Sequence, residues 1–185
     1  MTELHNRRRL RAGWIGAAGV ALLLAASPAW SSLVVRMNLD ELVAESDSVV
    51  EGTVEAVYSQ WDTDRRLVFT YASVRVDDPL KGQRRRALLI RQLGGRVGSL
   101  RMTVAGMPEF AAGERVIVFL KDSGNGTYHV VGMNQGRYAI TGDFAVSNLS
   151  GVDLLDPKAG VVSGASLATR VEVEEFKQRI RELAQ

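Results

Sequence analysis

The stretch Ala87–Lys121 reads ALLIRQLGGRVGSLRMTVAGMPEFAAGERVIVFLK. It contains three runs with the composition of β-strands, at 87–93, 100–104 and 114–121, and the turns between them contain glycine. The third run is apolar at every position from Val116 to Leu120, which is typical of a strand with both faces buried. We therefore expect this stretch to supply the centre of a β structure.

Two further strands are predicted before this stretch. Residues 48–58 alternate between apolar and polar side chains, and Gly52 among them predicts a bulge or a sharp bend. Residues 67–76 form the second strand, paired with the first as a hairpin, and Pro79 and Gly82 are expected to end it. The polar side chains of the first strand are expected to face solvent: Glu51, Thr53 and Glu55.

The last part of the chain predicts one more hairpin and a C-terminal helix. Residues 127–133 and 137–141 are expected to pair around a turn at Asn134–Gly136. Residues 142–164 show no hydrophobic period and are expected to be irregular. Residues 173–183 carry apolar side chains at helical spacing on one face, which predicts an amphipathic helix of about three turns.

A short N-terminal helix is predicted to begin at Asn38, because Asn38 can cap it and Glu41 completes a capping box. Short antiparallel strands, glycine bends and terminal helices together favour a mainly β fold, a small antiparallel OB-like barrel with this short helix and a C-terminal amphipathic helix. A β-sandwich is the alternative. The predicted organisation is a signal peptide at 1–30, the OB-like barrel domain at 31–150, and an irregular segment plus the C-terminal helix at 151–185.

The N-terminal segment has the features of a cleavable signal peptide. Four arginines precede an apolar run from Ala12 to Ala26, and small residues allow cleavage after Ala29 or Ser31. The run is shorter than the about 20 apolar residues that a membrane-spanning helix needs. We therefore expect cleavage, the general secretory route rather than the twin-arginine route, and no transmembrane segment in the mature chain. The protein is predicted to be periplasmic or extracellular.

The basic charge of the whole chain belongs largely to this leader. The chain has 23 basic and 21 acidic residues, and residues 1–30 hold four arginines and one glutamate. The rest therefore carries 19 basic and 20 acidic residues, a formal charge of −1. This balance gives no reason to expect nucleic-acid binding. The absence of cysteine excludes disulfides, thiol nucleophiles and cysteine-based metal sites.

No catalytic motif stands out in the sequence. The predicted mature chain has a single histidine, His129, without partners at the spacing of a catalytic triad or a metal site. Asp62 and Asp64 lie in a turn and are expected to be solvated, and the glycines of 94–98 have the spacing of a hairpin turn rather than of a phosphate-binding loop. We expect no enzyme activity and no cofactor. The enzymatic alternative is a metal-dependent hydrolase that uses Asp62, Asp64 or Glu109.

Three segments of the chain resemble a known family. They are DSVVEGTV at 47–54, VRVDDPLKG at 74–82 and FAAGERVIVFL at 110–120, and the similarity covers residues 45–140. They resemble bacterial netrin-like modules, which share an OB-fold with tissue inhibitors of metalloproteinases, and exported bacterial proteins of similar layout. The resemblance implies an OB-fold and a protein-binding role, with a metalloprotease as one class of partner. Those inhibitors bind the protease zinc through an N-terminal cysteine, which this chain lacks.

These observations predict an exported, non-enzymatic binding module whose partner is another exported protein. The expected contact surface combines basic residues around the third strand with the loop that precedes the fifth. The candidate surface residues are Arg84, Arg85, Arg86, Arg96, Met107 and Glu109. An envelope structural or assembly factor is a further alternative, which a large exposed apolar patch would favour.

Overall fold

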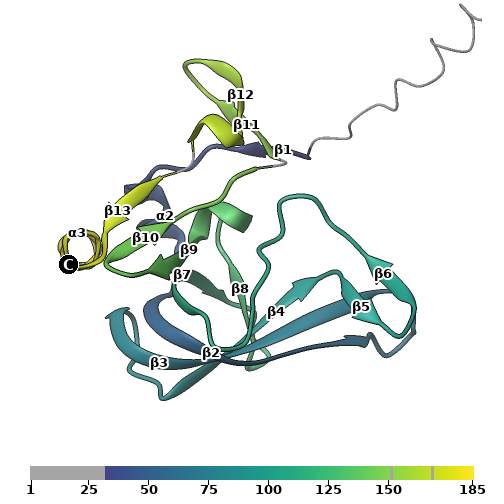
Figure 1. Cartoon of the computed structure of the whole chain (residues 1–185). Coiled ribbons are helices and arrows are strands. Elements are labelled where there is room, and N and C mark those ends of the chain that lie inside the picture. Colours follow the sequence, from purple (N-terminus) through teal and green to yellow (C-terminus); the bar gives the residue numbers. More distant parts are fainter. Residues whose placement is uncertain (1–31, 151, 168) are drawn as a thin grey trace, which may run out of the picture. The chain divides into compact units, whose positions relative to one another are not determined.

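The computed structural model describes residues 32–150, 152–167 and 169–185, and the predicted signal peptide lies outside them. The described chain is mainly β (Figure 1). Its strands are β1 (Ser32–Val35), β2 (Ser48–Trp61), β3 (Val68–Lys81), β4 (Ala87–Leu93), β5 (Gly95–Val97), β6 (Leu100–Met102), β7 (Arg115–Asp122), β8 (Tyr128–Val130), β9 (Arg137–Thr141), β10 (Phe144–Val146), β11 (Val152–Asp156), β12 (Gly160–Ser163) and β13 (Arg170–Glu172). Its helices are α2 (Leu39–Glu45), α3 (Val173–Leu183) and the short 3-10 helices η1 (Met133–Gly136) and η2 (Gly164–Leu167).

Five strands close into a barrel. Their order is β7-β2-β3-β4-β8, and β8 returns to pair with β7. Neighbouring strands are antiparallel except β4 and β8, which run parallel and pair at one position, Ile90 with Tyr128. This Greek-key order confirms the small OB-like barrel that the sequence predicts. Strand β4 has the predicted bounds.

Strand β2 is irregular because its pairing with β3 shifts register. One shift falls between Glu51 and Gly52, so the predicted bulge is confirmed. A side chain at Gly52 would overlap the backbone carbonyl oxygen of Arg75, which is why this position needs glycine. The prediction that Pro79 ends the second strand is wrong. Pro79 lies within β3 opposite Val50, at another shift where the regular ladder is already interrupted.

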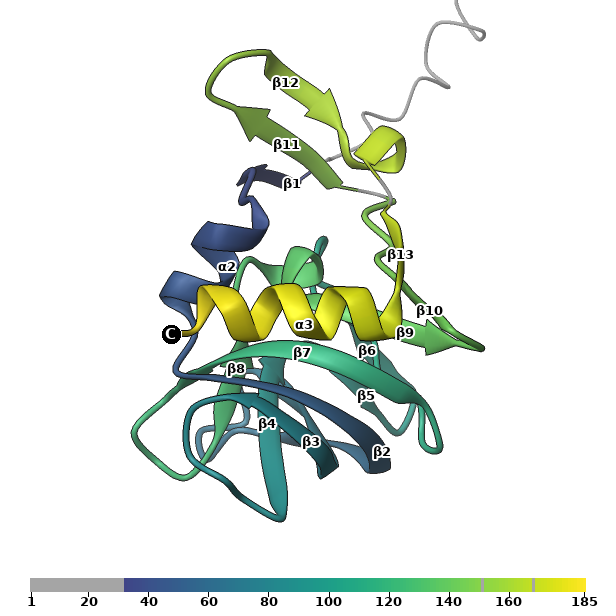
Figure 2. The ribbon, with the colours of Figure 1, turned by 90° about the vertical axis from the view of Figure 1, so that its left-hand side faces the viewer.

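Strand β7 separates two apolar cores, as its sequence predicts. Val116 and Val118 pack in the cluster formed by the barrel strands. Ile117 and Phe119 belong to a second cluster, which includes residues of α2 and α3. The Phe119 ring lies 6.3 Å from the Phe176 ring of α3, and Figure 2 shows α3 lying along β7. Both faces of β7 are therefore buried.

Both predicted α-helices are present. The Asn38 side chain accepts the backbone N–H of Glu41 at 2.9 Å, and the Glu41 side chain accepts the N–H of Asn38 at 2.8 Å, so the predicted capping box is confirmed. Helix α3 buries Phe176 and Ile180 in the second core. It also buries Lys177, which no hydrophobic pattern could indicate.

The predicted hairpin of residues 127–133 and 137–141 is wrong. Strands β8 and β9 both pair antiparallel with β7, β8 with its C-terminal end and β9 with its N-terminal half. The chain therefore continues in one direction through η1 and does not reverse. A side chain at Gly136 would overlap the carbonyl oxygen of Val131, so this turn is too tight for any other residue without rearrangement. Strand β9 then extends the sheet beyond the barrel to β10 and β13.

The prediction that residues 142–164 are irregular is also wrong. Strand β10 pairs with β9 and β13, while β11 and β12 form a hairpin. Strand β11 also pairs in parallel with β1, which gives a three-stranded sheet in the order β1-β11-β12. Strand β11 takes part of its pairing from β1, which lies far away in the sequence, so no local period indicates that pairing.

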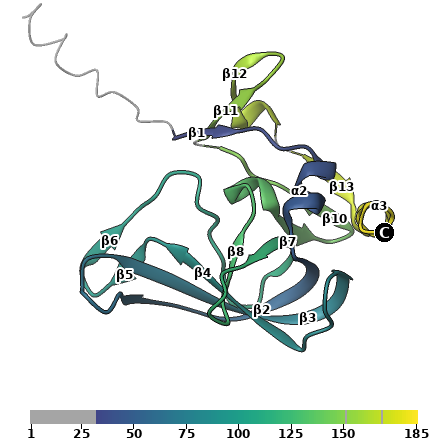
Figure 3. The same ribbon diagram turned by 180° about the vertical axis from the view of Figure 1, so that it is seen from behind.

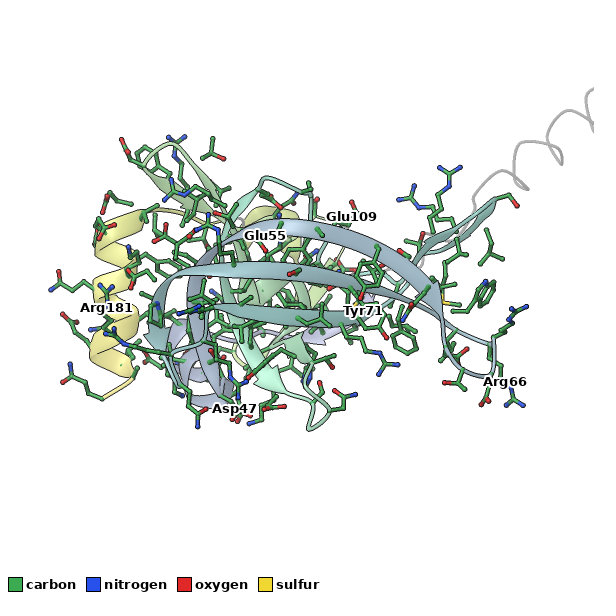
Figure 4. The ribbon with its side chains drawn as sticks, turned by 90° about the horizontal axis from the view of Figure 1, so that it is seen from below. Asp47, Glu55, Arg66, Tyr71, Glu109 and Arg181 are labelled. Atoms are coloured by element: carbon green, nitrogen blue, oxygen red, sulfur yellow. The ribbon has the colours of Figure 1, made fainter. Side chains whose placement is uncertain are left out.

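The predicted strand at 100–104 lies outside the barrel. Strand β6 pairs with β5 in a short two-stranded ribbon that follows β4 (Figure 3). The ribbon packs closely on the β2–β3 hairpin, since a side chain at Gly95 would overlap the hydroxyl of Thr70. In Figure 4 this hairpin runs from the side of α3, near Arg181, to its turn at Arg66.

Candidate functional site

The structure divides the predicted contact surface into two places. Residues 84–86 lie in the exposed loop before β4, and Arg96 lies on β5, after β4. Because β4 has seven residues, about 20 Å of strand separates the two. Arg96, Met107 and Glu109 do come together, around a cavity of about 250 Å³. The three arginines of the loop and this cavity therefore belong to opposite ends of β4.

A larger cavity, of about 1040 Å³, opens where the barrel strands separate. Strands β4 and β8 pair only at Ile90 and Tyr128, and the residues that follow in each strand, 91–93 and 129–131, line the cavity. Further walls come from residues 34–37, from α2, from the loop that contains Met107 and from Met133 of η1. We call this cavity the barrel groove. In Figure 3, β1 runs above β8 and α2.

The barrel groove has apolar walls that can adapt to a ligand. Three methionines contribute to them: Met37, Met107 and Met133. Methionine is flexible and polarizable, so it accommodates irregular apolar partners. The volume is at the upper end of the range of 300 to about 1000 Å³ that is typical of ligand sites. The cavity therefore suits an apolar ligand of substantial size.

Two β4 residues that line the barrel groove, Arg91 and Gln92, each carry a buried polar atom. Across the residues that the structure describes, neither Arg91 Nε nor Gln92 Oε1 has a hydrogen-bond partner. Both side chains are nevertheless held in place, because the Arg91 guanidinium lies 3.6 Å from the Phe69 ring centroid and Gln92 Nε2 donates to the carbonyl of Pro108. A buried polar atom without a partner is costly. Arg91 and Gln92 both line the groove, so the structure tolerates this cost in the wall of the cavity.

An exposed apolar face adjoins the barrel groove. Val35, Leu155 and Val161 lie directly opposite one another across β1, β11 and β12, and each is at least 40% exposed. Leu33 lies on the same face, two residues before Val35. Because Val35 also lines the barrel groove, the apolar surface continues outward from the cavity.

The carboxylates proposed for catalysis lie in two separate loops, with Asp62 and Asp64 together in one of them. Asp62 is in the β2–β3 turn, where its Oδ1 accepts the backbone N–H groups of Arg66 and Leu67. Glu109 is in the loop after β6 and its side chain is 88% exposed. His129 Nδ1 lies 3.1 Å from Ser123 Oγ at the rim of the barrel groove. Among the described residues, no group of three or more His, Asp or Glu side chains could hold a metal ion.

A charge cluster centred on the buried side chains of Lys177 and Glu51 holds α3 to the barrel. Lys177 Nζ lies 2.8 Å from both Glu51 Oε2 and Asp78 Oδ2, and Arg115 and Arg181 reach the same carboxylates at 2.6 Å. Glu51 was predicted to face solvent, and this is wrong, because α3 covers that side of β2. We call these five residues the charge cluster.

Ion pairing sets the protonation of the charge cluster. Burial opposes the ionisation of Glu51, but hydrogen bonds from Lys177 and Arg115 outweigh it and hold the pKa of its carboxyl below the usual value. The same balance, with Lys177 and Arg181 as donors, lowers the pKa of Asp78. Burial alone would lower the pKa of Lys177, but its carboxylate partners raise it. All three groups are therefore charged at neutral pH, so the ion pairs between α3 and the barrel are formed there.

Two findings concern the chain as a whole, one on its helices and one on its similarity to known proteins. In the part of the chain that the structure describes, no helix is long and apolar enough to cross a membrane. No protein-family model matches the sequence, and no curated protein matches it either.

Proposed function

We propose that the protein is a non-enzymatic binding module of the cell envelope or secretome, and that it holds an apolar segment of another exported protein in the barrel groove. The observation that carries this proposal is the groove itself. It combines about 1040 Å³ of mainly apolar space with two buried polar atoms, Arg91 Nε and Gln92 Oε1, that lack partners among the described residues. The N-terminal sequence supports the export of the protein.

The barrel groove is a better contact surface than the arginine loop that the sequence favours. Residues 84–86 are exposed at the other end of β4, and exposed arginines on a loop are typical of a solvated surface. Met107 is shared by the groove and the smaller cavity beside it. The part of the predicted surface that the proposal keeps is therefore the loop around Met107.

Site-specific photo-crosslinking can test the location of the contact. A photoreactive amino acid is placed at Met107 in the groove, at Arg85 in the loop, or at Glu182 on the exposed side of α3 as a control. The tagged full chain is then irradiated in cells that export it. We expect a single discrete adduct from position 107 and none from 85 or 182. An adduct from 85 alone would move the contact to the arginine loop, and the lack of any adduct from 107 would remove the support for a protein-binding groove.

A further inference from the structure

Strand β1 presents one of its edges to the barrel groove. The backbone N–H of Arg36 donates to the carbonyl of Leu155 in β11 at 3.0 Å, so alternate residues of this segment face β11. The backbone groups of Leu33, Val35 and Met37 therefore point to the opposite edge. Val34 and Val35 of β1 line the groove, as do Arg36 and Met37, which follow the strand. Since the side chains of Val34 and Val35 lie on opposite faces of β1, the edge between those faces runs along the groove.

The side chain of Gln135 already occupies part of this edge. Its Nε2 donates to the carbonyl of Val35 at 3.0 Å, and its Oε1 accepts the N–H of Met37 at 2.8 Å. A donor and an acceptor placed on alternate residues are what a neighbouring strand would supply. Gln135 is only 5% exposed, so it is a fixed part of the structure.

The edge of β1 has unpaired backbone groups next to the part that Gln135 occupies. Within the described residues, no hydrogen bond reaches the N–H of Val35 or the N–H and C=O of Leu33. An open strand edge readily pairs with another chain. The open groups begin at Val35, which lines the groove, and continue to Leu33.

We propose that the barrel groove binds an extended polypeptide segment of the partner, which adds as a strand to the open edge of β1 at Leu33–Val35. This inference rests on the proposed function and specifies the chemistry of the partner. The main chain of the segment pairs with β1 in continuation of Gln135, and every second side chain enters the groove.

The walls of the groove determine which side chains the segment carries. The side chains that enter the groove meet Val131, Met107 and Met133, so they are apolar. Arg91 has no carboxylate partner among the described ion pairs, so an acidic side chain of the segment complements its charge. A lipid would match the apolar walls but would leave the edge of β1 unpaired. The hydrogen-bonding pattern therefore selects a polypeptide.

The test begins with short random peptides displayed on phage and selected on the full chain. We expect the selected sequences to alternate apolar residues and to contain an acidic residue. The peptides are then measured against Val35→Pro and Val35→Ala. Proline removes the N–H that faces the groove and leaves the pairing with β11 intact, while alanine keeps the N–H and removes the side chain. We expect Val35→Pro to bind about tenfold more weakly than Val35→Ala.

A second measurement does not depend on the folding of a variant. Selected peptides are N-methylated at alternate residues, and we expect methylation to abolish binding to the wild-type chain on one register and to be tolerated on the other. Equal affinity of Val35→Pro and Val35→Ala together with tolerance of methylation on both registers would overturn strand addition. Strand addition would also be overturned if laurate displaced the peptides from Val35→Pro and from Val35→Ala at the same laurate concentration.

The two proposals fail in different ways. If crosslinking at Met107 gives its adduct but no peptide is selected, the binding module stands and the extended segment is wrong. If neither experiment finds a ligand, the proposed function fails as well.

Discussion

Replacing Lys177 with methionine removes the ammonium group that joins α3 to both β2 and β3. Lys177 is 7% exposed, and its Nζ lies 2.8 Å from carboxylate oxygens of Glu51 and Asp78. Removing one partner of a buried ion pair costs about 3–5 kcal/mol. Arg115 and Arg181 still pair with the two carboxylates, so we expect a smaller loss, about 2–3 kcal/mol of unfolding free energy. Methionine retains the apolar stem and limits the packing loss.

Urea denaturation followed by circular dichroism measures this loss, and Lys121→Met is the matched control. Lys121 forms an exposed pair with Asp47 at 3.6 Å, and such pairs contribute about 0–1 kcal/mol. In thermal melts, Lys177→Met should lower the midpoint by roughly 5–10 °C. If the two variants lose the same unfolding free energy within 0.5 kcal/mol, on the order of the measurement error, the charge cluster does not fasten α3.

The difference between wild type and Lys177→Met should depend on pH in a defined direction. The pKa values of Glu51 and Asp78 are lowered by folding from ordinary values of 4.5 and 3.8, so their contribution is present above those values and is lost as the pH falls through the lower folded pKa values. The pKa of Lys177 is raised from 10.5, so its contribution is complete below 10.5 and is lost only at still higher pH. We therefore expect a constant difference between about pH 5 and 10 that shrinks in acid. A difference that stays unchanged in strong acid would refute the ionic explanation.

Three further substitutions test the fold. Gly52→Ala should cost about 1–3 kcal/mol of unfolding free energy, because the new Cβ overlaps the carbonyl oxygen of Arg75; an unchanged urea midpoint would show that β2 can move aside. Asn38→Ala removes the side-chain cap of α2 and should cost about 1 kcal/mol, while Asn38→Asp keeps the cap and should cost little, and thermal melts distinguish the two. Gln135→Ala leaves the groups of β1 that Gln135 binds without their partner and should cost about 1–3 kcal/mol, with faster amide exchange at Met37 as the local readout; protection that persists there would contradict the assigned role.

Local patterns were sufficient for several elements. The capping box at Asn38 and Glu41 depends on residues three apart, so the sequence reveals it directly. Strand β7 was recognisable because apolar side chains on both faces predict burial on both faces, whatever the neighbours are. Gly52 was expected to form a bulge or a sharp bend for a similar local reason, since glycine inside a strand often marks one of these, and the structure shows the bulge.

Long-range pairing accounts for the errors. Strands β8 and β9 looked like a hairpin because a glycine turn joins two strand-like runs, yet both prefer the edge of β7 to each other. Strand β11 pairs with β1, which lies at the other end of the described chain, and no local pattern indicates that pairing. Glu51 was expected in solvent because polar and apolar residues alternate in the sequence of β2. That side of the strand is instead covered by α3.

The candidate site depends on the same long-range contacts. Arg91 and Gln92 were visible in the sequence only as polar residues of a strand, and no spacing distinguishes a polar residue that lines a cavity from one that faces water. The groove exists because β4 and β8 separate after one residue pair, and because residues 34–37 form one of its walls. The Gln135 side chain accepts the backbone N–H of Met37, just after β1, although 98 residues separate the two.

The sequence by itself determined the mainly β composition, the terminal helices and the lack of cysteine chemistry, and it favoured an OB-like barrel over a β-sandwich. These follow from periods, caps and composition, which are properties of neighbouring residues. Only the tertiary structure decided which strands pair, which charges are buried and where a cavity with unpaired polar atoms forms. Those features depend on residues far apart in the chain, whose contacts are fixed by the packing of the whole barrel.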